Sequence, residues 1–448
     1  MAEQSQTLFR DTQLAVARES TALPFLAAIR EQGQSAFAAA SIPGRKTEAW
    51  KYTSLYSLTA NTYGTAVTAE LNDELCTAAS VNGLGAARLV FINGQLSTEL
   101  SGALALQQVT LFSQADAEQQ AFIAEKLGSV LAQADNTAHL FNDLNNASVS
   151  EGVLIHIGKN EQLQQPLQIS YLTTTAAAPF IANARILMVL ESGADAILVE
   201  HYGSDSAAQT SFTNALTEIL VGDNARLQHY RLQLMQEEAF HIGSTHVALA
   251  RDSQYRSFHL ALGSRLTRND IVVNHNSGGS HSDVNGVYIP QHQQVVDFHT
   301  CIEHRVPNCT SGETFRGIMN DKAKAVFNGR IHIHPKAQKT AAELSNKNLL
   351  LTNTAEVDTK PELEIYADDV KCAHGATVAQ LEEKAMFYLQ SRGVSRQEAE
   401  VMLSFGFINE LLEALPHKTI SSLLRPLLAR RFGRDQSLSQ HLLAGENA

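Results

Sequence analysis

Three turn-and-strand segments decide the fold: SGADAILVE (192–200), VGDNARLQ (221–228) and ARDSQYRSFHL (250–260). Asp195, Asp223 and Asp252 recur 28 and 29 residues apart, each ahead of a short strand-like run. A turn signal that returns at near-constant spacing is typical of stacked coils, because each coil buries its face only against its neighbours. Short strands between turns would also fit an antiparallel sandwich. The spacing favours a parallel β-helix.

The same texture extends outward from these segments over residues 151–373. Short alternating runs are separated by Gly, Asn, Asp and Ser, and no amphipathic helix interrupts them, which argues against βαβ units. Residues 1–150 read as mixed and mostly helical, with one strand at 87–94, and residues 374–448 are helical again. Helices are expected at 21–40, 117–133, 139–147, 377–393 and 397–415. The prediction is a mainly β protein whose core is flanked by helical N-terminal and C-terminal regions.

Composition and charge argue against several classes of protein. Of the 448 residues, 34 are Lys or Arg and 46 are Asp or Glu, so the net charge of −12 argues against a nucleic-acid binder. No apolar stretch approaches the ~20 residues of a membrane helix. The start, MAEQSQTLFRD, lacks the apolar region of a secretory signal. We therefore expect a soluble cytoplasmic protein whose partners include neither nucleic acid nor membrane.

The familiar enzyme motifs are missing from the sequence. None of GxxxxGK[ST], GxGxxG, GxSxG and HExxH occurs. The four cysteines form no CxxC pair, so neither a zinc ribbon nor a self-contained ferredoxin-type cluster site is indicated. The cysteines are Cys76, Cys301, Cys309 and Cys372. The sequence displays no self-sufficient active site.

Histidines gather in the second half of the predicted core. Ten of the seventeen lie between residues 241 and 334, and imidazole is a ready ligand for iron, zinc and copper. Because strand residues i and i+2 point the same way, VDFHTCIEH places one polar row on a single face: Asp297, His299, Cys301 and Glu303. His332 and His334 share a face in the same manner. Each set is either a candidate ligand row or a row that faces solvent or another subunit.

Cys372-Ala373-His374 forms a sharper pair on the last predicted strand. Both side chains would face one way, and a thiolate beside an imidazole suits a soft metal or an activated nucleophile. A buried, inert cysteine is the alternative. The spacing alone does not separate these interpretations.

The second C-terminal helix carries a broad apolar stripe. Its members are Val401, Phe405, Ile408 and Leu412, with Leu415 beyond them. A stripe of this width must be covered, either by the rest of the chain or by a partner that docks on it.

Several stretches together resemble the SufB/SufD scaffold proteins of the SUF iron–sulfur cluster assembly machinery. They are PGRKTEAWKYT (43–53), EHRVPNCTSGETFRGI (303–318), AVFNGRIHIHPKAQKTAAELSNKNLLL (325–351), ELEIYADDVKCAHGATV (362–378) and FYLQSRGVSRQEAE (387–400). These stretches follow the family's order over most of the chain. His374-Gly375-Ala376 stands where the SufB branch has His-Glu-Ala, and the segment LSNKNLLLTN lacks that branch's cysteine. The chain is therefore similar to the branch that partners SufB.

The resemblance implies a right-handed parallel β-helix core and a role as a non-catalytic scaffold subunit. It implies that the C-terminal helices, with Val401, Phe405, Ile408 and Leu412, dock a SufC-type ABC ATPase, while the β-helix edge pairs with a SufB-type paralogue. His374 would face the paralogue's cysteine as an iron or cluster ligand, with Cys372 beside it in a less defined role. Family members are also linked to iron acquisition, to a transient iron–sulfur cluster and to reduced flavin, although no residue here places the flavin.

Two other classes of protein stay open from the residues alone. A β-helix carbohydrate-active enzyme, such as a polysaccharide lyase, would be exported and would carry a groove of clustered Asp, Lys and Arg. A stand-alone His-rich metalloenzyme would hold stoichiometric metal after purification. An open β-helix edge would also allow the chain to form a homodimer when alone.

Overall fold

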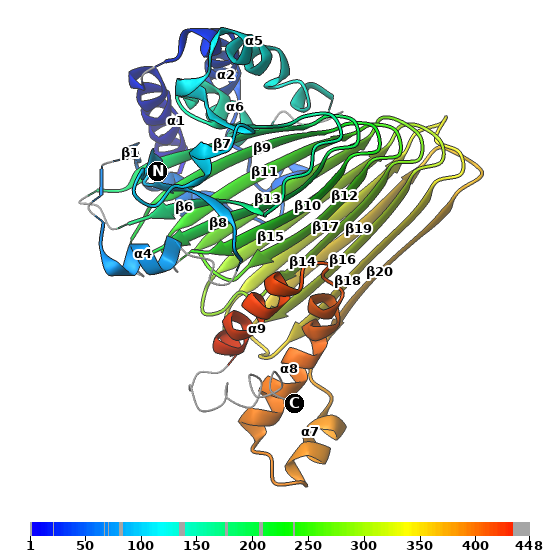
Figure 1. Ribbon diagram of the computed structural model, residues 1–448. Helices are drawn as coiled ribbons and strands as arrows, with labels where there is room; N and C mark the ends of the chain where they lie inside the picture. Colours follow the sequence, from blue (N-terminus) through cyan, green and yellow to red (C-terminus); the bar gives the residue numbers. More distant parts are fainter. Residues whose placement is uncertain are drawn as a thin grey trace.

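Strands that alternate between two sheets form the core of the protein (Figure 1). The computed structural model describes residues 2–432 except 21, 67, 70, 80–83, 134–138, 175–177, 206–208 and 236–237. From β5 (Val153–Ile157) to β20 (Lys371–Ala379), consecutive strands fall in opposite sheets, and each strand as far as β18 pairs in parallel with the strand two positions further on. This topology is a parallel β-helix. The β-helix prediction is confirmed, and the antiparallel sandwich is excluded.

In the described part of the chain, each sheet contains ten strands. Sheet A contains β1 (Gly64–Thr65), β4 (Val109–Leu111), β5, β7 (Phe180–Leu190), β9 (Phe212–Val221), β11 (Phe240–Leu249), β13 (Leu266–His275), β15 (Val295–His304), β17 (Lys324–Ile333) and β19 (Glu356–Ile365). Sheet B contains β2 (Ala87–Ile92), β3 (Gln95–Leu96), β6 (Leu167–Thr173), β8 (Asp195–Ser204), β10 (Arg226–Leu234), β12 (Gln254–Ala261), β14 (His281–Tyr288), β16 (Thr310–Met319), β18 (Ala341–Leu350) and β20.

The regularly spaced aspartates mark successive corners of the coil. Asp195 begins β8 and pairs in register with Arg226 of β10, which pairs with Gln254 of β12. Asp252 has a φ of 54°, a left-handed conformation that Asp and Asn adopt more readily than bulkier residues. The Asp223 carboxylate accepts a hydrogen bond from the Arg251 backbone N–H at 3.0 Å, which joins one corner to the next. The three aspartates therefore mark the same corner in successive coils. They do not occupy equivalent positions, because the register advances by 31 residues from Asp195 to Arg226 and by 28 from Arg226 to Gln254.

Polar side chains as well as apolar ones fill the interior between the two sheets. The fully buried Glu200 of sheet B lies 2.8 Å from His229 Nε2 and accepts a hydrogen bond from Thr217 of sheet A at 2.9 Å. Arg231 donates to Thr245 across the interior at 2.8 Å. These bonds tie the sheets together where a purely apolar core would have no directional contacts.

Most of the N-terminal region covers part of sheet A, whereas Leu75 and Ala79 pack against β2 and β6 of sheet B. The helices of this region are α1 (Ala2–Glu19), α2 (Ala27–Ala39), α3 (Tyr56–Thr59), α4 (Asp73–Ala79), α5 (Ala117–Lys126) and α6 (Leu140–Ser148), joined by short 3₁₀ turns at 24–26, 48–50, 103–105, 112–114 and 131–133. Phe9, Phe37 and Phe141 pack against Phe212 and Phe240 of sheet A in one buried cluster. Burial of these aromatic rings holds the region on the sheet.

The C-terminal region lies on the outer face of sheet B. It contains α7 (Glu383–Gln390), α8 (Arg396–Glu413) and α9 (Lys418–Phe432). The predicted capping box is present, because Ser395 accepts from the Glu398 backbone while Glu398 accepts from that of Ser395. The helix expected from 377 begins only at Glu383, because the chain through Ala379 still pairs with β18.

The last coil is the open end of the β-helix. β19 and β20 are the terminal strands of their sheets, and no strand in the described parts of the chain pairs with their outer edges. Ile365, Tyr366 and Val378 are exposed there. A row of free strand edges with apolar neighbours is a template for pairing with another chain.

Candidate functional site

Cys372 and His374 lie on the edge strand β20, as the sequence predicts. Cys372 is in register with Ala342 and His374 with Leu344, and both of these β18 residues belong to the buried core. The two side chains therefore face the interior layer at the open end of the coil. Cys372 is half-buried against the core, and burial raises the pKa of its thiol, whereas His374 is exposed.

Cys372 and His374 are two potential ligands without a third beside them in the described part of the chain. Among the described residues, the one grouping of three or more His, Cys, Asp or Glu side chains with convergent ligand atoms contains neither Cys372 nor His374. A metal ion or cluster at this strand would need ligands from another molecule. An incomplete site at an open edge is suited to assembly between two chains.

The polar row on β15 divides into two parts. Val296, Phe298 and Ile302 are buried in the core, so the predicted assignment of the two faces is confirmed. Asp297 lies beneath the N-terminal segment, where it accepts hydrogen bonds from Arg268 at 2.8 Å and from Thr53. Burial alone would raise the pKa of Asp297, but Arg268 and His299 hold it below its usual range. This part of the row is a structural ion-pair network.

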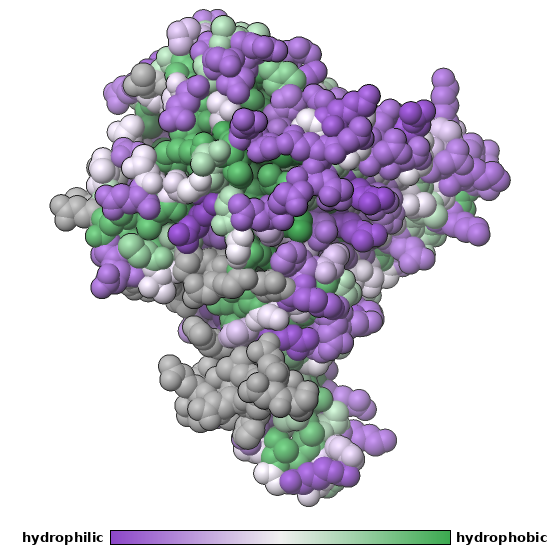
Figure 2. Space-filling view, in the orientation of Figure 1, coloured by the Kyte–Doolittle hydropathy of each residue, from purple (hydrophilic) through white to green (hydrophobic). Residues whose placement is uncertain are grey.

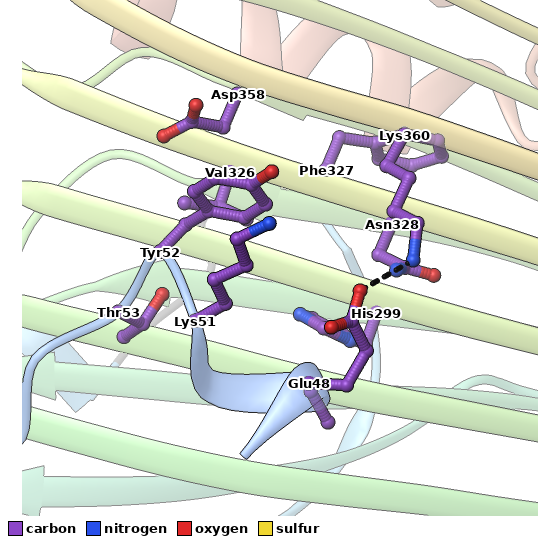
Figure 3. Close-up of a pocket in the computed structure, with 11 residues that line it drawn as sticks. Glu48, Lys51, Tyr52, Thr53, His299, Val326, Phe327, Asn328, Asp358 and Lys360 are labelled. Atoms are coloured by element: carbon purple, nitrogen blue, oxygen red, sulfur yellow. Dashed lines mark hydrogen bonds and ion pairs between the residues drawn. The ribbon is translucent and has the colours of Figure 1, made fainter. Parts of the chain in front are cut away.

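The segment 48–53 closes over that network (Figure 3). The Arg268 guanidinium stacks on Trp50 at 3.9 Å from the ring centroid, and Glu48 pairs with Lys360 of β19 at 2.7 Å. The pocket between this segment and sheet A has a volume of about 10 Å³, roughly the space of one water molecule. The segment 48–53 therefore packs closely against sheet A, and the space between them is too small for an organic ligand.

The other part of the row meets the two histidines of RIHIH. Glu303 is in register with His332 on β17. One oxygen of the Glu303 carboxylate, Oε2, lies 2.7 Å from His332 Nδ1 and 2.8 Å from His334 Nε2. The three ligand atoms all lie within 4.8 Å of one another. The sequence indicated each half of this cluster but not that the halves converge.

The remaining histidines of the His-rich region are divided between the interior and the surface. His241, His259 and His275 are fully buried inside the coil, and burial lowers the pKa of each well below its usual value. His281 is paired with Asp283 on the surface at 3.0 Å. Sequence reasoning missed the interior network of Glu200. The signal that could have found it is parity, because Glu200 shares a face of β8 with the interior residues Leu198 and Tyr202.

The apolar stripe of α8 packs inside the protein. Phe405, Ile408 and Leu412 share a buried cluster with Tyr230 and Leu260 of sheet B. Val401 is buried as well. The four side chains that were expected to contact a partner are therefore buried within this chain. This agrees with the alternative in which the rest of the chain covers the stripe.

Other side chains of the same region remain exposed. Phe387 and Tyr388 of α7 and Met402 of α8 are 72%, 55% and 44% exposed. Figure 2 shows hydrophobic residues on this part of the surface, where α7 and the start of α8 project from the β-helix. Contiguous exposed apolar side chains mark interaction surfaces more often than isolated ones do.

Family models match both halves of the chain. The model described as "SUF system FeS cluster assembly, SufBD core domain" matches residues 171–407, and that of the SufBD protein N-terminal region matches residues 1–169. In the described part of the chain, no helix is long and apolar enough to cross a membrane.

Curated relatives match almost the whole chain. The iron–sulfur cluster assembly protein SufD of Escherichia coli is 33% identical over 406 residues, which cover 90% of this chain and 88% of that protein. An iron–sulfur cluster assembly SufBD family protein of Synechocystis sp. is 31% identical over 397 residues, or 87% of each chain. A chloroplastic protein of Arabidopsis thaliana, ABCI7, is 26% identical over 90% of this chain and 85% of its own length.

Proposed function

The chain belongs to the SufBD family of iron–sulfur cluster assembly proteins and is a SufD homologue; from that premise we propose that it is a non-catalytic scaffold subunit of a SufBCD-type complex. In that complex it pairs with a SufB-type paralogue and binds a SufC-type ABC ATPase. The place of action is the cytoplasm, where thiols stay reduced.

The single observation that carries this proposal is the position of Cys372 and His374. They are two potential ligands on β20, a strand whose outer edge has no partner in the described structure. β20 offers free backbone groups for pairing and presents His374, with Cys372 beside it, at the same open end. A paralogue that added its own strand there would bring the missing ligands. His374 is the proposed iron or cluster ligand, because its imidazole is exposed while the Cys372 thiol is partly buried.

The ATPase contact is proposed on the projecting C-terminal helices. Phe387, Tyr388 and Met402 supply exposed apolar surface, while the buried stripe with Phe405 anchors the same helices to sheet B. Motion of a docked ATPase would then act on sheet B through a rigid connection. This arrangement supports a lever that transmits ATP-driven movement to the edge where the cluster is built.

The cargo of the proposed complex is iron, a transient iron–sulfur cluster and electrons from reduced flavin. Sulfur-rich clusters need soft or imidazole ligands at an accessible position, which β20 offers. The flavin belongs to the assembled complex in this proposal, and we assign no residue to it. A homodimer through the same edge is the proposed state of the chain when the paralogue is lacking.

Anaerobic affinity purification of the tagged chain, followed by mass spectrometry, tests the proposed complex. We expect an ABC-type ATPase and a β-helix paralogue to copurify. The chain alone, with sugar-cleaving activity, would contradict the proposal.

The proposed ligand is tested by His374→Ala. The complex should assemble with this variant, but cluster yield in anaerobic reconstitution should fall at least tenfold. His156→Ala is the matched control, because His156 is a partly exposed histidine on β5 that pairs with Glu191 at 2.9 Å. Normal cluster yield from His374→Ala would remove His374 from the mechanism.

A further inference from the structure

We propose that Glu303, His332 and His334 form a binding site for a divalent first-row transition metal ion, separate from the ligand pair on β20. The site lies on the outer face of sheet A, near the C-terminal ends of β15 and β17. Binding of metal by the isolated chain does not depend on the proposed complex. That the natural occupant is Fe²⁺ does rest on the proposed function.

The spacing of the three ligand atoms fits a metal ion. Ligands bound at about 2.1 Å and at right angles to one another lie about 3 Å apart. Glu303 Oε2 lies 2.7 Å from His332 Nδ1 and 2.8 Å from His334 Nε2, so a small outward shift would make room for the ion. Two imidazoles and one carboxylate with open remaining positions are the ligand set of non-haem Fe²⁺ sites and of catalytic Zn²⁺ sites.

The strands hold the ligands in place before any metal binds. Glu303 and His332 are direct partners across the parallel pair β15–β17, and His334 follows two residues later on the same side. The Glu303 side chain is 2% exposed, whereas those of His332 and His334 are 12% and 24% exposed. The site therefore has a buried base and a mouth through which a hydrated ion can enter.

Neighbouring side chains orient the carboxylate, as outer partners do in established metal sites. Arg330 donates to the other oxygen of Glu303, Oε1, at 3.2 Å, which leaves Oε2 for the histidines. Glu364 of β19 in turn fixes Arg330 through two hydrogen bonds of 2.9 and 2.8 Å. The two carboxylates and one guanidinium leave a net negative charge, which favours a cation.

Cys301 lies at the rim of the site. Its thiol donates to Glu303 Oε1 at 3.3 Å, and burial raises the pKa of that thiol well above its ordinary value. The thiol is directed at Oε1, the oxygen that does not face the two histidines, so the proposed site has three protein ligands. Metal-binding measurements distinguish this site from a hydrogen-bonded network without metal.

The test is anaerobic metal binding by the full purified chain, stripped of metal beforehand. Co²⁺ serves as the spectroscopic probe, and Fe²⁺ is followed by equilibrium dialysis with iron analysis. We expect one equivalent to bind at this site. His332→Ala/His334→Ala should weaken affinity by more than the roughly 10–100-fold caused by losing an outer partner. His281→Ala, which removes a surface histidine paired with a single carboxylate, should bind as the native chain does.

Glu303→Gln guards against misfolding as an explanation, because glutamine keeps the shape and can still hydrogen-bond to the histidines. Thermal unfolding in a chelator should show that this variant is folded, while its Co²⁺ affinity should fall by a similar factor. Retention of the metal by the double histidine variant, or no binding by the native chain, would overturn the proposal. Intact metal binding by a chain that recruits neither ATPase nor paralogue would instead contradict the proposed function alone.

Discussion

Alternation along a strand decides whether a charged or titratable residue of this protein meets solvent or the core. Glu303 and His304 are neighbours in sequence, yet Glu303 faces the outer histidines while His304 stacks inside on His275 at 4.5 Å between ring centroids. Burial lowers the pKa of His304 to about 4, so the interior ring stays neutral at physiological pH. Two adjacent residues therefore lie in different environments because of parity alone.

The interior position of Glu313 has a measurable effect on how stability depends on pH. Glu313 is buried inside the coil, and burial, partly offset by Thr300, raises its pKa to about 8. The folded chain thus keeps a proton that the unfolded chain releases near pH 4.5. Stability from this group is present below that pH and is lost as pH rises through about 8. Each unit between the two pKa values corresponds to roughly 1.4 kcal/mol.

We therefore expect Glu313→Gln to flatten the pH dependence of unfolding. Urea unfolding at pH 5 should find the variant about as stable as the native chain, and at pH 8.5 the variant should be more stable by a few kcal/mol, since roughly 1.4 kcal/mol accompanies each unit of the shift. Glu343→Gln, at a surface position of β18, is the control and should leave the profile unchanged. Parallel profiles for native chain and Glu313→Gln would show that Glu313 ionises freely in the fold.

At the scale of elements, the spacing of residues along the sequence predicted the repeating coil. It failed where pairing between strands overrides the local preference for a helix. The spacing of the aspartates predicted the β-helix, and the capping box of Ser395 and Glu398 predicted the start of α8. The expected helix start at 377 was wrong, although α7 follows from Glu383, because β18 offers backbone partners as far as Ala379. This long-range pairing leaves no local sequence pattern. The convergence of Glu303 with His332 needed the register between β15 and β17, which the sequence does not state.

The same scale separates two roles of apolar residues in the C-terminal helices. Phe405 is buried against sheet B, so Phe405→Asp should detach α8 from the sheet and lower stability by roughly 3–5 kcal/mol. Phe387 is exposed, so Phe387→Asp should leave the free energy of unfolding within about 0.5 kcal/mol. In a pull-down, Phe387→Asp should still weaken ATPase binding at least tenfold.

Chemical denaturation and ATPase titration, run on both variants, check this pair. Phe387→Ser is the milder control for loss of the ring without an added charge. Unchanged ATPase affinity for Phe387→Asp would move the docking surface away from α7. A stable, soluble Phe405→Asp variant would show that the stripe contributes little to the packing of α8.

At the scale of the whole molecule, the N-terminal region covers sheet A but leaves the last coil of the described β-helix open. N-terminal helices and the segment around Trp50 cover sheet A and reach as far as Lys360 on its last strand. β19 and β20 nevertheless keep unpaired outer edges in the described structure. Repeat architectures need a cap at each end, because the outer face of a terminal coil is otherwise apolar. A partner chain is the simplest cap for this one.

Val378 tests whether the open end is the pairing surface. It is 50% exposed and is in register with the buried Asn348, so its side chain faces the layer that a stacked partner coil would cover. Val378→Lys can extend its ammonium group into water in the free chain, whereas pairing would bury an unpaired charge. Since roughly 1.4 kcal/mol corresponds to a tenfold change in affinity, we expect at least about hundredfold weaker pairing with the paralogue. Val378→Thr, which keeps the branched shape, should pair nearly as well as the native chain. Light scattering should show Val378→Lys as a monomer. Its thermal unfolding and its ATPase binding should match those of the native chain. A variant that still pairs would place the interface on another face of the molecule.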